Sequence, residues 1–379
     1  MKILITTDLF TTQTNGVVTS VKNLREELVK KGHDVRVLTL SDNMHSKHED
    51  DVYYIRSLPI GVYPNIRMPM TYRHKLIREM VEWKPDIIHS QCEFFSLQFA
   101  LYISRKTGAP IVHTYHTMYE QYVSYVFPSE RIGKQVVRVW SRQRLKSVDK
   151  IIVPTHKVEN ALHEYGVDDM SIVPSGISLD QHKKRISPEE RLKKRRELGI
   201  KDDELVLINL GRLGAEKNIG ELVELFSKAI KKRSNLRFLI VGDGPAREEL
   251  EELARELGIF EKIVFTGMVP PDEVHEYYQL GDVFVSASNS ETQGLTYIEA
   301  AASGLPLLCR EDLCLDDVIV QSENGYQYKS EEEFLTWLDS IVDNPEWRAA
   351  ASKKSEEIAE SFDKSVFGDS VEKIYKSVL

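Results

Sequence analysis

Short apolar runs alternate with longer amphipathic segments along the first half of the chain. The runs at residues 2–6, 34–40, 86–89, 110–114 and 150–154 are rich in β-branched residues and are predicted to be parallel strands. Between them, residues 17–31, 73–83 and 95–107 repeat apolar positions at helical spacing. This alternation predicts a doubly wound α/β domain.

A second series of the same kind follows. Strands are predicted at residues 206–210, 237–241, 263–266, 283–286 and 306–308, and helices at 219–232, 246–257, 272–280 and 295–303. The chain of 379 residues is long enough for two domains, because single cores stop growing near 250 to 300 residues. Ligands are expected at the carboxyl ends of the strands in both sheets.

The turn Pro174-Ser175-Gly176-Ile177 and the polar, charged stretch at residues 181–194 mark the predicted boundary. We expect an N-terminal domain at residues 1–175, a C-terminal domain at 176–360 and a last segment at 361–379. The tail from residue 353 to 379 has a helical pattern.

Composition is that of an ordinary globular protein, with 41% hydrophobic and 29% charged residues. No apolar run reaches the length of a membrane span, and the first residues lack the pattern of a signal peptide. The three cysteines have no metal-type spacing and are expected to be reduced. These features predict a cytoplasmic protein, and no nucleic-acid partner is expected.

The densest set of candidate site residues lies where the strand at 283–286 leads into the helix that begins near Leu295. Gly294, Leu295 and Thr296 offer backbone N–H groups at a helix start, which is a site for anions. Glu291 precedes the helix and Glu299 lies about one turn inside it, so the two carboxylates can hold two hydroxyl-bearing parts of one ligand. A nucleotide-sugar fits this arrangement, although exposed glutamates are more often only solvated.

A second set follows the strand at 206–210. Arg212 carries a planar fork of donors and Lys217 a compact charge, and both can converge on one diphosphate at the end of that strand. The alternative is a loop with two solvated cations.

Together the two sets resemble a known family. The pattern Gly-Arg212-x-x-x-Glu-Lys217-Asn, followed by Ser-x-Ser-Glu291-x-x-Gly294-x-x-x-x-Glu299-Ala, is similar to the C-terminal half of retaining GT-B glycosyltransferases of family four. The resemblance implies an α/β GT-B fold, with two Rossmann-like domains that face each other across a cleft. It also implies that residues 181–194 form the interdomain linker and that the helix at 361–379 packs back on the first domain.

The resemblance further implies the roles of the residues in the second domain. Arg212, Lys217 and the helix N–H groups would stabilise the charge that develops on the leaving phosphate, which itself takes the acceptor's proton. Glu291 would hold the sugar and Glu299 the ribose. The remaining nucleotide-lining positions would be Gly244, Met268, Val269, Gly294, Leu295 and Thr296. No Asp-x-Asp cluster stands at the expected place, so neither a metal nor a cofactor is expected.

In the first domain, Asn15 and Gly16 lead from the first strand region into a helix and match the position that approaches the donor phosphate in the family. Many relatives have two glycines there, so the detailed geometry differs. An Asn-Gly pair is otherwise a common turn. His116 follows the fourth strand in a segment similar to the one that carries the active-site histidine of lipid-directed members, while His113 is expected to be structural.

Charge distribution indicates the acceptor. Residues 1–180 hold 23 basic and 20 acidic residues, whereas residues 181–379 hold 27 and 39, so net charges are +3 and −12. At about 100° per residue, the cations of residues 131–146 fall in one arc of a helix and the apolar residues in another. That pattern suits an anionic bilayer, although a packed helix with a solvated basic face is an equal alternative. The expected membrane-binding residues are Arg131, Lys134, Arg138, Trp140 and Arg142.

The run from His116 to Tyr122 is similar to that of Gram-positive-type diacylglycerol glucosyltransferases, and the segments 118–128 and 59–69 could face lipid beside it. The resemblance therefore implies transfer of glucose from UDP-glucose to 1,2-diacylglycerol at the inner face of the cell membrane, with the anionic lipids as partners. Two alternatives stay open: a soluble or polyprenyl-linked acceptor, and a non-catalytic protein that binds a nucleotide-sugar. The oligomeric state is not predicted.

Overall fold

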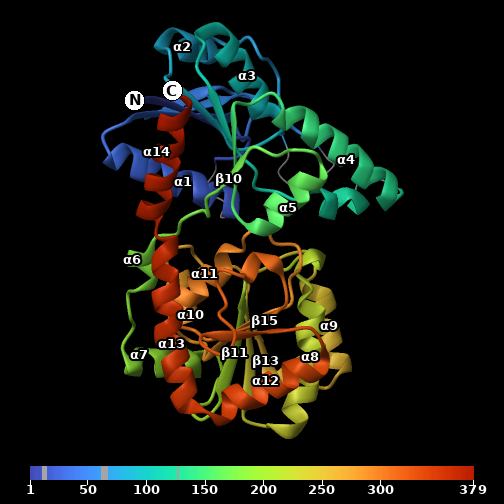
Figure 1. Cartoon of the computed structure of the whole chain (residues 1–379). Helices are drawn as coiled ribbons and strands as arrows, with labels where there is room; N and C mark the ends of the chain where they lie inside the picture. Colours follow the sequence, from blue (N-terminus) through green and yellow to red (C-terminus); the bar gives the residue numbers. More distant parts are fainter. Residues whose placement is uncertain (11–14, 61–66, 126–127) are drawn as a thin grey trace. The chain divides into compact units, whose positions relative to one another are not determined.

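A computed structural model describes residues 1–10, 15–60, 67–125 and 128–379. The chain divides into two compact units. The first unit is Met1–Ile177 together with Lys364–Leu379, and the second is Ser178–Asp363. The last helix of the chain therefore belongs to the unit that contains the first strand (Figure 1).

The first unit contains an eight-stranded sheet in the order β10-β9-β8-β7-β1-β2-β4-β3. The pairs are parallel except for β3, which runs antiparallel to β4, and a two-stranded sheet of β5 and β6 stands beside them. The strands are β1 (Lys2–Thr6), β2 (Asp34–Leu40), β3 (Lys47–Glu49), β4 (Val52–Ile55), β5 (Ser57–Pro59), β6 (Arg67–Pro69), β7 (Ile87–Ser90), β8 (Ile111–Thr114), β9 (Lys150–Val153) and β10 (Met170–Ile172).

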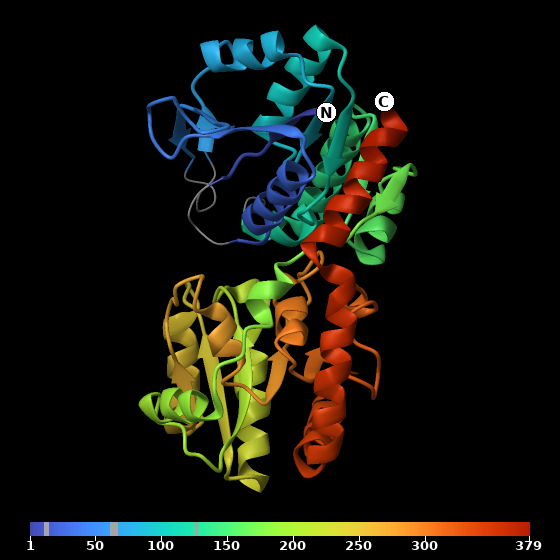
Figure 2. The ribbon, with the colours of Figure 1, turned by 90° about the vertical axis from the view of Figure 1, so that its left-hand side faces the viewer.

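Helices cover both faces of this sheet. On one face α1 and α14 pack side by side, with Leu24 and Tyr375 in their shared core (Figure 2). On the other face α2 and α3 enclose a second core around Met80 and Phe99. The helices of this unit are α1 (Gly16–Lys30), α2 (Lys75–Trp83), α3 (Phe95–Thr107), α4 (Glu130–Leu145), α5 (His156–Glu164) and α14 (Lys364–Val378).

The second unit has a six-stranded parallel sheet in the order β13-β12-β11-β14-β15-β16, with the crossover between β13 and β14 that doubly wound nucleotide-binding sheets share. Its strands are β11 (Leu205–Leu210), β12 (Leu236–Val241), β13 (Ile263–Phe265), β14 (Val283–Ser286), β15 (Leu307–Arg310) and β16 (Gly325–Tyr328). The two sheets confirm the prediction of two doubly wound α/β units.

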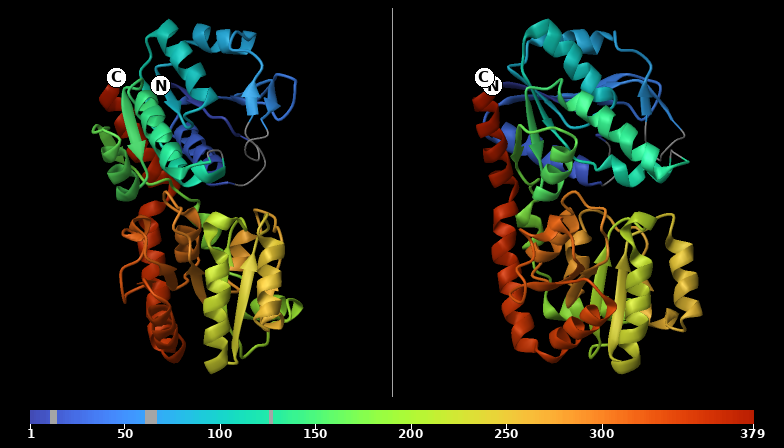
Figure 3. Two further views of the ribbon diagram at one scale, coloured as in Figure 1. Left: turned by 90° about the vertical axis from the view of Figure 1, so that its right-hand side faces the viewer. Right: turned by 45° about the vertical axis from the view of Figure 1, so that its right-hand side comes forward.

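Helices α8, α9 and α12 share one core with the second sheet, and α11 and α13 pack against each other elsewhere in the unit (Figure 3). The helices are α6 (Leu179–His182), α7 (Pro188–Glu197), α8 (Ile219–Lys232), α9 (Arg247–Glu256), α10 (Val274–Tyr278), α11 (Leu295–Ala302), α12 (Glu331–Asp343) and α13 (Pro345–Ala359). Among the described residues, none of the helices combines the length and the apolar character needed to cross a bilayer.

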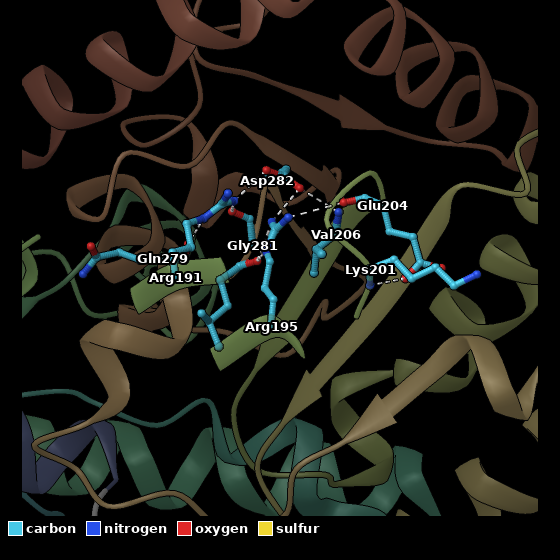
Figure 4. A network of polar contacts seen from close by, with 9 residues as sticks. Arg191, Arg195, Lys201, Glu204, Val206, Gln279, Gly281 and Asp282 are labelled. Carbon is cyan, nitrogen blue, oxygen red and sulfur yellow. Dashed lines mark hydrogen bonds and ion pairs between the residues drawn. The ribbon is translucent and has the colours of Figure 1, made fainter. Parts of the chain in front are cut away.

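The charged stretch predicted to be a linker is instead part of the second unit. Ser187 caps α7 by accepting a hydrogen bond from the Glu190 backbone N–H at 3.1 Å. Arg191 and Arg195, one turn apart, both reach Asp282 at 2.7 and 2.8 Å (Figure 4). Arg195 is buried, and a buried cation without its carboxylate would cost about 3–5 kcal/mol. This network holds α7 against the start of β14.

The tail is not one helix. Helix α13 ends at Ala359, a 3₁₀ turn occupies Glu360–Phe362, and α14 begins at Lys364 after an extended Asp363. The chain passes from the second unit to the first at this break. Helical periodicity on both sides concealed it, because one extended residue leaves little trace in a hydrophobic pattern.

Candidate active site

Arg212 and Lys217 lie in the loop that joins β11 to α8. The Arg212 guanidinium donates to the Glu216 carboxylate, one turn further along. Gly214 makes room for that carboxylate, because a Cβ at this position would lie 2.5 Å from both of its oxygens. Glu216 was not singled out in the sequence, yet it holds the Arg212 side chain in place.

The loop after β14 is fastened to the same turn. Lys217 Nζ lies 2.5 Å from Glu291 Oε1, and Ser288 Oγ donates to that oxygen at 3.1 Å. Ser290 Oγ donates to the Glu216 carbonyl at 3.0 Å. The structure thus brings together two motifs that lie more than seventy residues apart in the chain.

The start of α11 has the geometry of an anion site. Gly294 adopts a φ of 74°, and a Cβ there would lie 2.3 Å from the Tyr297 ring, so the turn requires glycine. Leu295 and Thr296 then open the helix and present first-turn N–H groups. Glu299 lies one turn inside the helix, where its Oε2 accepts a hydrogen bond from the buried Tyr278 hydroxyl at 2.8 Å.

The loops after β12 and β13 border the same edge of the second sheet. Gly244 lies so close to the Arg212 loop that a Cβ would stand 2.4 Å from the Leu213 carbonyl oxygen. Met268, just after β13, is 81% exposed, and Val269 is half-buried. Gly244 therefore has a packing reason of its own, and Met268 offers an uncovered apolar surface at a strand end.

In the first unit, His116 follows β8 and lies beside the residues that follow β7. Its Nε2 is 2.7 Å from Gln91 Oε1, and the Gln91 side chain is buried. Burial, with a smaller contribution from nearby His113, lowers the pKa of His116 to about 3. The imidazole is therefore neutral at physiological pH, and the contact with the amide oxygen places its proton on Nε2.

His113 occupies the buried side of the same segment. Its Nε2 lies 3.1 Å from Glu93 Oε1, and the Tyr119 hydroxyl donates to the other oxygen of Glu93. His113 and Glu93 are both inaccessible to solvent. Gln91 and Glu93 were missed from the sequence, although polar residues directly after a buried strand were the available signal.

Asn15 caps α1, since its Oδ1 accepts a hydrogen bond from the Val18 N–H at 2.8 Å, and Gly16 is the first residue of the helix. Both belong to the first unit, as does His116. The charged candidate residues, Arg212, Lys217, Glu291 and Glu299, belong to the second unit.

The cations of α4 fall into two groups. Arg138 is held by two carboxylates, Glu120 at 3.1 Å and Glu164 at 2.8 Å. The other predicted membrane-binding cations are exposed, and these are Arg131, Lys134 and Arg142.

The apolar side of α4 differs from the expected one. Trp140 packs against Phe94 and Tyr119, with ring centroids 5.0 and 5.6 Å away, which ties it to the rest of the unit. Three apolar residues of the predicted apolar arc are 46–63% exposed: Ile132, Val136 and Val139. The buried strip of α4 is narrow, because it holds only Gly133, Ser141 and Leu145. The neighbouring apolar segments stay predictions, since residues 61–66 and 126–127 lie outside the described residues.

Comparison with known proteins places this geometry in a family. Residues 14–181 match the model described as Glycosyltransferase Family 4, and residues 190–358 match Glycosyl transferases group 1. An α-monoglucosyldiacylglycerol synthase of Streptococcus pneumoniae is 35% identical over 372 residues, which cover 97% of this chain and 84% of that protein. Another of Acholeplasma laidlawii is 34% identical, covering 100% of this chain and 98% of the relative.

Solved structures share the fold. The Anabaena protein HepE, crystallised in complex with UDP, has a TM-score of 0.80 at 16% identity and covers all of both chains. Sucrose-phosphate synthase from Thermosynechococcus elongatus has a TM-score of 0.78 at 20% identity, covering 99% of this chain and 98% of its own. With two Rossmann-like units, both family models and near full-length relatives, the chain belongs to the family-four glycosyltransferases and is a hexosyltransferase.

Proposed function

We propose that this enzyme transfers glucose from UDP-glucose to 1,2-diacylglycerol with retention of configuration, giving an α-glucosyl lipid. The observation that carries the proposal is 34–35% identity, over nearly the whole chain, to two α-monoglucosyldiacylglycerol synthases. The same chain pairs Lys217 with Glu291 in its second unit. Among the structural neighbours, HepE has been crystallised with UDP-glucose, which supports that donor.

On the donor side, the diphosphate replaces the internal carboxylate partners of Arg212 and Lys217. Both cations and the N–H groups at the start of α11 then face the phosphate on which negative charge develops. Glu291, released from Lys217, turns to the sugar hydroxyls, and Glu299 receives the ribose.

The chemical step needs no enzymic nucleophile. The acceptor hydroxyl oxygen forms a bond to the anomeric carbon on the face from which the β-phosphate oxygen departs. The hydroxyl proton passes to that phosphate oxygen, so UDP leaves and the glucoside keeps the α configuration. Neutral His116, whose Nε2–H is bonded to Gln91, accepts a hydrogen bond at Nδ1 from a hydroxyl near the transferred sugar without adding a charge.

On the acceptor side, α4 supplies the membrane surface. Exposed cations attract anionic lipid headgroups and exposed aliphatic side chains enter the region below them. This is an amphipathic surface of the kind that a peripheral enzyme needs to reach a substrate confined to a bilayer. The protein would then work at the cytoplasmic face of the membrane.

The reaction is tested by mass spectrometry of products made from mixed nucleotide-sugars and vesicles of diacylglycerol with phosphatidylglycerol. We expect one hexose added to diacylglycerol, glucose as the preferred sugar, and an α linkage by NMR. Exclusive transfer to an added polyprenyl phosphate or to a soluble sugar would contradict diacylglycerol as the acceptor. Binding of UDP-glucose without release of UDP would contradict the proposal that the protein is catalytic.

The membrane surface is tested with a triple variant that replaces Arg131, Lys134 and Arg142 by alanine. Each cation near an anionic surface contributes about 1 kcal/mol, so the loss of about 3 kcal/mol should weaken vesicle partitioning over a hundredfold. The matched control removes three cations from α8 in the second unit: Lys228, Lys231 and Lys232. Equal binding by the two triple variants would show that α4 is a solvated surface only.

A further inference from the structure

Tyr278, the last residue of α10, lies beneath α11 and is fully buried. Its hydroxyl donates to Glu299 Oε2 at 2.8 Å, while the Thr296 carbonyl oxygen is further away at 3.4 Å. A hydroxyl has one proton to donate, so the shorter, charge-assisted bond to the carboxylate is the main interaction.

The Tyr278 ring is held on two sides. The His182 ring packs edge-on against it at a centroid distance of 5.9 Å, and Phe284 of β14 lies 6.2 Å away. Burial and the neighbouring Glu299 carboxylate keep the pKa of Tyr278 well above its usual value, so the hydroxyl stays protonated. It is therefore a donor of fixed position and fixed protonation.

Glu299 presents its other oxygen differently. Its side chain is half-buried, and within the described part of the chain no protein group donates a hydrogen bond to Oε1. A glutamate on a helix has three rotatable side-chain bonds, and ordering it costs conformational entropy unless neighbours already hold it. The bond to Oε2 orders the side chain before any ligand arrives.

We infer that Tyr278 is a positioning residue for ribose recognition: it holds one oxygen of Glu299 so that the other is presented to the ribose diol of the nucleotide. This inference rests on the proposed function, which assigns Glu299 to the ribose. The contact with the ligand is made by the carboxylate, but the orientation of that carboxylate comes from a tyrosine that never touches the ligand.

The alternative is that Tyr278 only fills the core beneath α11. The two readings differ in what the hydroxyl does, because Tyr278→Phe removes one oxygen and keeps the ring. A filler would tolerate this change, or would lose affinity for every ligand alike through a general loosening of α11.

The experiment measures by calorimetry the affinities of UDP and of 2′,3′-dideoxy-UDP, because the second ligand lacks both ribose hydroxyls. In Tyr278→Phe we expect UDP to bind about tenfold more weakly, as for loss of one hydrogen bond to a charged group, and dideoxy-UDP to bind as in wild type. The KM for the donor should rise by a similar factor while kcat stays within about twofold. Tyr277→Phe, on the same short helix, is the matched control and should change neither ligand.

Equal losses for both ligands, or no loss for either, would overturn the inference. Glu299→Ala separates it from the proposed function: if that variant still prefers UDP over dideoxy-UDP as wild type does, the ribose assignment itself fails and the inference fails with it. Glu299→Gln provides a second approach that leaves the tyrosine ring in place, and it should show the same selective loss of UDP. In a double-mutant cycle, Tyr278→Phe should add little to Glu299→Gln.

Discussion

The candidate residues of the two units differ in how they are held. In the second unit they are charged and partly exposed, and they pair with each other, as Lys217 does with Glu291. In the first unit His116 is half-buried and neutral, and it is held by a short polar contact with the buried Gln91. Arg212 is 45% exposed in its side chain, whereas His113 is fully buried.

This difference fits the two halves of a transfer reaction. A dianionic diphosphate can replace the internal carboxylates, because an exposed ion pair contributes little by itself and exchanges readily. A neutral hydroxyl cannot compete in that way, so the groups that meet it have to be oriented beforehand. Under the proposed function, the second unit would exchange charged partners and the first would present oriented groups.

The largest expected effect concerns the phosphate cations. Arg212→Ala and Lys217→Ala should each lower kcat by roughly a hundredfold or more, by analogy with the loss of a fixed donor to a developing anion. Steady-state assays of UDP release would measure this. Lys228→Ala, which breaks an exposed pair with Glu331 on the same unit, should leave kcat unchanged. Near-normal turnover in both site variants would remove the phosphate assignment.

Loss of the Glu299 carboxylate and loss of the Glu291 carboxylate should weaken the binding of different ligands. Glu299→Ala should weaken UDP and UDP-glucose about tenfold or more, because the ribose is common to both and a hydrogen bond to a charged group contributes about 1.5–3 kcal/mol. Glu291→Ala should weaken the binding of UDP-glucose but not the binding of UDP. Calorimetry with both ligands decides this, and identical losses in both variants would contradict the assignment.

Acid should affect the stability of the first unit through His116. Because the folded pKa of His116 is lowered to about 3, the unfolded chain binds more protons below pH 6.5, and stability falls as the pH drops toward 3. His116→Gln should reduce this slope by up to about 1.4 kcal/mol per pH unit, measured by urea unfolding between pH 7 and 5.

Asp8 is the matched control of opposite sign. Burial raises its pKa to about 6, so the folded state binds the extra proton and Asp8 lowers stability as the pH rises from about 4 to 6. Asp8→Asn should therefore make the stability of the protein rise more steeply with pH. Equal slopes in wild type and both variants would show that neither group is linked to unfolding.

The smallest expected effect is that of chelation. Cations and helix N–H groups stand where metal-dependent transferases place a carboxylate-bound ion, so EDTA should leave turnover within about twofold. A dialysed sample assayed with and without magnesium is the control. Loss of activity on chelation that magnesium or manganese restores would refute the expectation.

Most of the sheet and of the helices was predictable because each depends on a local pattern. The strands Lys2–Thr6 and Asp34–Leu40 and the helices Phe95–Thr107 and Ile219–Lys232 have the bounds that the apolar spacing predicts. The strand β16 and the helix α12 were not predicted; the sequence of β16, Gly-Tyr-Gln-Tyr, lacks the β-branched residues of the strands that were predicted.

Helix α7 shows why charge alone misleads. Its sequence is polar apart from Pro188 and Leu192, which predicts a solvated linker, but Arg191 and Arg195 both pair with Asp282, about ninety residues away. A partner so distant in the chain leaves no local sign. The exposed aliphatic residues of α4 are a similar case, because a helical wheel shows two arcs without showing which of them the neighbouring elements cover.

The sequence by itself determined the family, the order of the elements and the motif positions at Arg212, Lys217, Glu291 and Glu299, because these depend on residue type and on short spacing. The tertiary structure decided which carboxylate pairs with which cation, which atom of His116 is engaged, and that Tyr278 holds Glu299. The physical reason is range: periodicity and motifs extend over a few turns, whereas an orienting hydrogen bond joins whatever residues the fold brings within 3 Å.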